Sequence, residues 1–297
     1  MYGSTYLKKL TQKSPLYYFE KAMDFINKYQ LFAINVFRAI IFNNISFYYQ
    51  LKSDSKNELL FLNNAFAELK KANGKNYYHV SHVLINIGSY YLRQKSTSLA
   101  RSYFFKSLRI RNITFGKHNI LSFRNYLFIG NSYFIEQNYS QAIRYYQNAL
   151  EILSPPKNIL GNLKTPDVSH ITFLPELIDV LRNKSKCLNL LYNSSGNIRH
   201  LKASFECSII ISKLVDNIRK NLTGVESKSI LSANAVSIYE NSIITSYSLL
   251  RITNNVTYLN SAFELAGKCK AISLLENINE NEARLNTSIP DGLYSKE

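Results

Sequence analysis

The sequence predicts an all-α fold, a solenoid of helical hairpins that is continued by longer helical hairpins. In the first half of the chain one side-chain pattern recurs after 42 residues, for example at Gly88 and again at Gly130. A different pattern recurs with a longer period in the second half. The 297 residues include only 10 Gly and 6 Pro, which is few for an all-β chain because strands need many turns. A fixed period is the sequence mark of stacked repeats that bury one continuous core.

The array begins with a partial repeat before residue 33, where "YYFEKAMDFINKYQ" (17–30) has the apolar spacing of a helix. The first full repeat is predicted near 33–70. It carries Ser46 where the later repeats have Gly, and Glu58 where they have Ala. This repeat therefore departs from the pattern that the next two share.

The second and third repeats are predicted near 79–112 and 121–154, which completes an array over residues 1–154. Small residues inside helices let a neighbouring helix approach closely, and aromatic side chains then fill the volume beside them. Equivalent positions of the two repeats carry matching residues. The residues predicted to pack the repeats are Gly88, Tyr91, Ala100, Phe104, Gly130, Tyr133, Ala142, Tyr146 and Ala149.

This spacing resembles the tetratricopeptide-repeat (TPR) signature: Gly, Tyr three residues on, Ala twelve on, an aromatic sixteen on and a small residue nineteen on. The usual TPR is about 34 residues long, so a 42-residue spacing resembles the variety with long loops. The resemblance implies a right-handed superhelix in which the first helix of each repeat lines a concave groove. It also implies a scaffold that binds a protein or peptide partner.

The TPR register places the groove on particular positions of each first helix. Amide side chains there can hold an extended peptide backbone, and Arg can bind a carboxylate. An acidic partner is therefore compatible with the pattern. The groove candidates are Asn43, Phe47, His82, Asn86, Ser89, Arg93, Arg124, Leu127 and Asn131.

The second half has its own, 58-residue period. "GNIRHLKASFE" (196–206) recurs as "NNVTYLNSAFE" (254–264). "SPPKN" ends the array, because Pro cannot continue a helix. We therefore expect a linker over 155–167, longer hairpins over 168–279 and a polar tail over 280–297.

The segment "YLNSAFELAGKCKAISLLENI" (258–278), followed by "IPDGL" (289–293), resembles the helical region between TPR arrays and CHAT domains. CHAT domains are caspase-like proteases of bacterial TPR–CHAT proteins. The resemblance implies a sensor or regulatory portion. The residues up to Glu297 contain no protease domain, so we expect that domain to lie beyond them.

The net charge of +16 offers a second hypothesis, a basic helical-repeat protein that binds nucleic acid. Basic residues are frequent between Arg93 and Arg124, but their neighbouring aromatic residues are expected in the core, so the pattern favours a peptide partner. No apolar run is long enough for a membrane span, and no secretory signal is found. We expect a cytoplasmic protein without a membrane partner.

The sequence predicts no enzyme activity of its own, no cofactor and no metal. His79 and His82 lack a third ligand in any zinc motif. The cysteines are distant from one another and lie in apolar helical contexts, as expected for buried thiols. A cryptic cysteine hydrolase that uses Cys187 or Cys269 remains the third hypothesis.

Overall fold

The structure is a computed structural model, and it describes residues 14–29, 33–72, 77–153, 161, 163–168, 171, 175–221 and 225–286. These residues form eleven α-helices, one 3₁₀ turn and no strand, which confirms the predicted all-α class. The chain forms two compact units, Met1–Gln137 (unit 1) and Asn138–Glu297 (unit 2). The predicted division of the chain into an array, a linker and longer hairpins stays a prediction.

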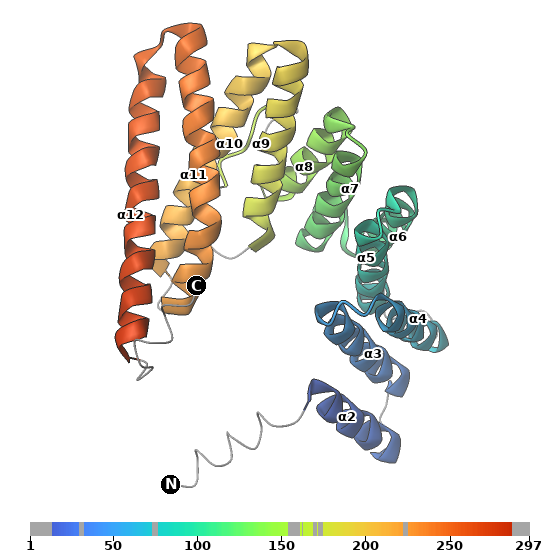
Figure 1. The fold of residues 1–297 in the computed structure, drawn as a ribbon. Helices are drawn as coiled ribbons and strands as arrows, with labels where there is room; N and C mark the ends of the chain where they lie inside the picture. The colour runs from blue at the N-terminus through green and yellow to red at the C-terminus, as the bar shows by residue number, and fades with distance from the viewer. Residues whose placement is uncertain are drawn as a thin grey trace. The chain divides into compact units, whose positions relative to one another are not determined.

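Unit 1 contains the shorter helices (Figure 1, blue to green). Their order along the chain is α2 (Pro15–Tyr29), α3 (Ile34–Leu51), α4 (Ser55–Lys71), α5 (Tyr77–Arg93), α6 (Thr97–Phe115), the 3₁₀ turn η1 (Ile120–Ser122) and α7 (Phe123–Ile135). Each helix contacts the next, and α3 also contacts α5, as α5 contacts α7. The first helices of successive repeats are therefore neighbours, which is the arrangement of a solenoid.

Unit 2 contains longer helices, apart from its first. Their order is α8 (Tyr139–Leu153), α9 (Pro175–Ser195), α10 (Ile198–Asn221), α11 (Val225–Thr253) and α12 (Val256–Asn286). Each helix contacts the next one along the chain. The helix α12 continues to Asn286, into the segment predicted as a polar tail, because Glu, Ala, Arg and Leu in "ENEARLN" are good helix formers.

The period of the first half also governs the residues that end every second helix. Ser53, Lys95 and Gln137 follow α3, α5 and α7, and each has a positive φ, between 57° and 60°. The amide of each donates to a carbonyl in the last turn of its helix, at 3.0 Å in all three cases. A left-handed residue at this position closes a helix C-terminus and redirects the chain. The 42-residue spacing of matching side chains is therefore also the spacing of these left-handed residues.

The longer period governs the turns of unit 2 in the same way. Gly196 follows α9 with φ 65°, and Asn254 follows α11 with φ 53°. The next residue in each turn caps the following helix: the side chain of Asn197 accepts from the Arg199 amide at 3.1 Å, and that of Asn255 accepts from the Thr257 amide at 3.0 Å. Both helix pairs therefore use one turn design.

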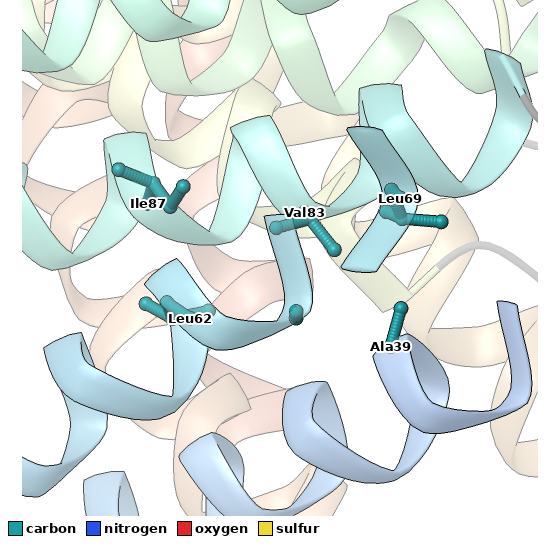
Figure 2. Packing of buried hydrophobic residues seen from close by; sticks show 6 residues of the cluster. Ala39, Leu62, Leu69, Val83 and Ile87 are labelled. Atoms are coloured by element: carbon teal, nitrogen blue, oxygen red, sulfur yellow. The ribbon is translucent and has the colours of Figure 1, made fainter. Parts of the chain in front are cut away.

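The core of unit 1 is shared between helices of successive repeats. Figure 2 shows Ala39 from α3, Leu62 and Leu69 from α4, and Val83 and Ile87 from α5 converging on one cluster. Every one of these side chains is at most 3% exposed. Burial of this kind stabilises a hairpin only when its neighbour is present, so the repeats support one another.

Gly88 shows why a small residue is required on α5. A Cβ atom built on Gly88 would lie 2.5 Å from Cε1 and 2.7 Å from Cδ1 of Phe104 on α6. Phe104 is fully buried, and its ring stacks on that of Phe128 at 5.5 Å between centroids. The ring therefore occupies the space that a side chain at position 88 would need.

Unit 1 buries a cation without a carboxylate partner. The side chain of Arg111 on α6 donates to Ser81 Oγ at 3.1 Å, to Asn125 Oδ1 at 2.9 Å and to the Leu121 carbonyl. Burial lowers the pKa of Arg111 to about 10, so it stays charged at neutral pH. This side chain joins α5 and α7 to the η1 turn. Arg111 follows Phe104 and Leu108 along the buried face of α6, which is a sequence signal for burial.

Unit 2 buries a cation in a similar way. The ammonium of Lys184 on α9 donates to Gln147 Oε1 at 2.7 Å, to Thr165 Oγ1 at 2.9 Å and to the Lys164 carbonyl at 3.0 Å. Burial lowers its pKa. These bonds attach the irregular residues 163–168 to α8 and α9, although the sequence predicted a linker there. Val168 at the end of this segment is also fully buried.

Candidate functional site

The surface formed by α3 and α5 carries two adjacent hollows, both within unit 1. The larger, of about 160 Å³, is lined by residues that include Asn43, His79 and His82. The smaller, of about 50 Å³, includes Phe47 and Asn86. Six of the predicted groove positions line one hollow or the other, and these are Asn43, Phe47, His82, Asn86, Ser89 and Arg93.

A hydrogen bond between amide side chains joins the two hollows. Asn86 Nδ2 donates to Asn43 Oδ1 at 2.7 Å, across successive repeats. Next to it, the hydroxyl of Ser89 is enclosed and has no hydrogen-bond partner among the described residues. Phe47 is 56% exposed beside these polar groups. The surface thus combines polar groups and one exposed ring, which suits a segment with both peptide bonds and apolar side chains.

The larger hollow lies in a positive environment. Burial lowers the pKa of His82 to about 4, and the charges of Arg124, Arg111 and His79 lower it further in that order. His79 also has a lowered pKa because it is partly buried. The His82 imidazole is therefore neutral at pH 7, whereas Arg111, with a pKa of about 10, keeps its charge. An anionic group placed here would be attracted, and it would raise the pKa of His82.

Arg93 at the end of α5 is not free to bind a ligand carboxylate. It forms an ion pair with Glu58 on α4, and Glu58 is 5% exposed. This pair explains why Glu58 replaces the Ala of the later repeats: its carboxylate compensates the Arg of the next repeat. The sequence shows Glu58 at a position where the later repeats have Ala, but it does not show the ion-pair partner Arg93, which lies on another helix.

The three predicted groove residues on α7 line neither hollow. The guanidinium of Arg124 lies over the Phe128 ring, 5.7 Å from its centroid. Leu127 is 2% exposed, so it offers no surface to a ligand. Asn131 is half-buried. We therefore place the candidate surface on α3 and α5, with Arg124 as a contributor to its positive potential.

Several of the basic residues between Arg93 and Arg124 are buried or paired, whereas Lys95, Lys106, Arg109 and Lys117 are exposed. Arg111 is 2% exposed, and Arg93 is paired with Glu58. Arg101 forms an ion pair with Glu136 at 2.7 Å and lies over the Tyr133 ring. Charges that are buried or paired contribute little to phosphate binding. The buried or paired members of this set are therefore poor candidates for phosphate contacts.

The thiols do not have the environment of a cysteine nucleophile. Burial raises the pKa of Cys187 to about 12 and also raises the pKa of Cys207 and of Cys269. A nucleophilic cysteine needs a lowered pKa so that the thiolate forms. Among the described residues, no three His, Cys, Asp or Glu side chains are grouped as metal ligands. Within the same residues no helix has the length and apolar character needed to cross a membrane.

No protein-family model matches the chain, and no curated protein matches it in sequence. Among solved structures, the crystal structure of BtubC (BKLC) from P. vanneervenii is similar with a TM-score of 0.56 and 12% identity, over 94% of this chain and 95% of that one. A putative kinesin light chain from Podosopora anserina with nearly identical TPR-like repeats has a TM-score of 0.48 and 12% identity, over 78% and 92%. The apo form of RapI has a TM-score of 0.48 and 13% identity, over 84% of each chain.

At these identities the similarity concerns the fold alone. The likeness to BtubC extends over nearly the whole chain. It agrees with the repeated turns and the nearest-neighbour helix contacts described above. The chain therefore has a TPR-like helical-repeat fold.

Proposed function

We propose that the chain is a protein-interaction scaffold that binds an extended, acidic segment of a partner on the α3–α5 surface. One observation carries the proposal: six of the nine groove positions expected from the sequence line two adjacent hollows that the Asn86–Asn43 hydrogen bond joins. Amides of this kind can exchange their mutual bond for bonds to a peptide backbone. The positive environment of His82 supplies the preference for acidic side chains.

A selection from a random library of short peptides on the immobilised protein tests this proposal. We expect the selected peptides to be rich in Asp and Glu. Fluorescence anisotropy of one such peptide should show an affinity loss of about tenfold in Asn43→Leu, since one polar contact is worth roughly 1.4 kcal/mol. Asn63→Leu is the matched control, because Asn63 is exposed on α4.

Protonation of His82 gives the experiment a second readout. An anionic peptide raises the pKa of His82, so binding takes up a proton and strengthens as the pH falls from 7 towards 5. The variant His82→Gln should lose this pH dependence. Selected peptides without acidic residues, or peptides that bind Asn43→Leu as well as wild type, would contradict the proposed surface.

We also propose that the chain is the sensor or regulatory portion of a bacterial, cytoplasmic TPR–CHAT protein. The support is the resemblance of residues 258–278, which lie within α12; "IPDGL" (289–293) lies outside the described residues. Sequencing the gene beyond the codon for Glu297 tests this role. An α/β segment with a His and a Cys downstream would support it, and a stop codon there would contradict it.

A further inference from the structure

Unit 2 has a cavity of its own that the α3–α5 surface does not include. It has a volume of about 560 Å³ and is formed by α9, α10 and α11. This volume is within the usual range for small-ligand sites. Residues of α9 at helical spacing provide most of the described lining, to which α10 adds Ser208 and Ile211 and α11 adds Asn241.

The lining is cationic. Arg182 and Lys186 lie one turn apart on α9, and none of the described residues that line the cavity is acidic. The nearest carboxylate described for Arg182 is that of Asp179, which pairs with it on the exposed side of the helix. A ligand that carries at least one negative charge is therefore favoured here.

Among the described residues, one acceptor in the lining, Asn189 Oδ1, lacks a hydrogen-bond donor, which a ligand could supply. Asn189 Oδ1 is enclosed and has no hydrogen-bond partner among the described residues, while its Nδ2 donates only a long bond of 3.5 Å to Thr245. An enclosed acceptor without a partner is costly, and a ligand N–H would satisfy it. Asn183 and Asn241 add two further amide side chains to the same lining.

The composition of the cavity excludes two other classes of ligand. Among the lining residues that the structure describes none is aromatic, so they offer no ring to stack on a nucleobase. Leu190 and Ile211 are the only aliphatic residues in the described part of the lining, which is too little apolar surface for a lipid tail. What fits is a polar anion with several N–H and C=O groups.

We propose that this cavity binds a short acidic peptide of a few residues. Its carboxylates would lie at Arg182 and Lys186, and a backbone N–H would donate to Asn189 Oδ1. The amides of Asn183 and Asn241 would pair with other peptide groups. The proposal does not rest on the function proposed for unit 1, because the two sets of residues share no member.

Isothermal titration calorimetry with N-acetyl tri-aspartate amide at low ionic strength tests the proposal on the full chain. We expect one binding event whose affinity falls at least tenfold in Lys186→Glu and about tenfold in Asn189→Leu, the change that corresponds to roughly one hydrogen bond. Lys202→Glu is the matched control, because Lys202 is exposed on α10 and does not line the cavity. Circular dichroism checks that each variant is folded.

Three further measurements decide between this cavity and its rivals. N-acetyl tri-asparagine amide should bind at least tenfold more weakly, and Asn43→Leu should leave tri-aspartate binding unchanged. The proposal would be overturned if tri-aspartate failed to bind at millimolar concentration. It would also be overturned if Asn43→Leu abolished tri-aspartate binding while Lys186→Glu and Asn189→Leu left it unchanged. Tighter binding of AMP than of tri-aspartate would identify a nucleotide site instead.

Discussion

In unit 1 the turns between paired helices recur with the 42-residue period, whereas in unit 2 they recur with the 58-residue period. The left-handed residue is Ser53, Lys95 or Gln137 in the short period and Gly196 or Asn254 in the long one. The longer period corresponds to roughly two extra turns in each helix, at about 3.6 residues per turn. The comparison teaches that one turn design serves helices of different length, since the turn depends on local backbone conformation only.

Both units combine aromatic rings with buried hydroxyl residues in their interiors. Unit 1 stacks aromatic rings, such as Tyr91 on Tyr103 and Phe104 on Phe128. Unit 2 buries the rings of Tyr146 and Tyr239. Buried hydroxyls occur in both units: Ser132 of unit 1 and Ser246 of unit 2 each donate to a carbonyl of their own helix. Small hydroxyl side chains satisfy themselves locally, so long helices can approach without bulky residues between them.

Both units also bury one cation that bonds only to neutral oxygens. Arg111 binds the carbonyl of Leu121 before α7, and Lys184 binds the carbonyl of Lys164 before α9. In each case an irregular segment that precedes a helix is attached to the helices beside it. A carbonyl in such a segment has no ladder partner, and a buried donor compensates it.

Removal of either buried cation should have the largest effect. Arg111→Met and Lys184→Met each leave three oxygen acceptors without their donor, and we expect a loss of about 3 kcal/mol in the free energy of unfolding. Urea denaturation measures it. Arg109→Met and Lys202→Met are the controls, because both side chains are exposed on the surface. A loss in only one of the two units would break the parallel between them.

Gly88→Ala should have the next largest effect. The added Cβ collides with the buried Phe104 ring, and overpacking of this kind costs about 2 kcal/mol. Gly267→Ala on α12 is the matched control in unit 2, since nothing lies within 4 Å of a Cβ there. The control should be neutral or slightly stabilising. If Phe104→Leu does not rescue Gly88→Ala, the collision is not the cause.

The stability of unit 1 should depend on pH through His82. Its pKa is about 4 in the folded chain and about 6.5 when unfolded, so the unfolded state binds the proton more readily between these values. Stability is therefore complete above about pH 6.5 and falls as the pH decreases towards 4. Allowing for partial exposure, we expect wild type to lose roughly 1–2 kcal/mol more than His82→Gln between pH 7 and 4.5.

The urea midpoints of both proteins at the two pH values give this difference. Carboxylates titrate in the same range, but they are common to wild type and variant and cancel in the comparison. The described residues that line the cavity of unit 2 include no His, so this pH dependence distinguishes the α3–α5 surface from that cavity. Equal pH dependence in the two proteins would show that His82 is not held in its neutral form.

Substitutions at the left-handed residues should have the smallest effects, and opposite signs. Lys95→Gly removes a strained side chain and should stabilise by about 0.5 kcal/mol. Gly196→Ala should destabilise by about 1 kcal/mol. A Cβ at position 196 would contact nothing within 4 Å, so its cost is conformational only. Equal signs in the urea midpoints would refute the idea of a shared turn.

Much of the fold was predictable because the spacing of matching residues gives the length of each repeat. Gly88 and Phe104 indicated a close helix pair, and Ser53 and Lys95 lie in the same register although their positive φ was not foreseen. The buried cations were harder to recognise. Arg111 and Lys184 follow apolar residues at helical spacing, but a long basic side chain on such a face can also extend into solvent.

The amino-acid sequence alone determined the helical class, the two periods and the first helices that carry the candidate surface, because these depend on spacing within single helices. The tertiary structure decided which side chains meet. Glu58 neutralises Arg93 and Asn86 bonds to Asn43 across successive repeats, and the cavity of unit 2 draws its lining from three helices. Such contacts depend on how helices pack against one another, and helical periodicity carries no information about the facing surface.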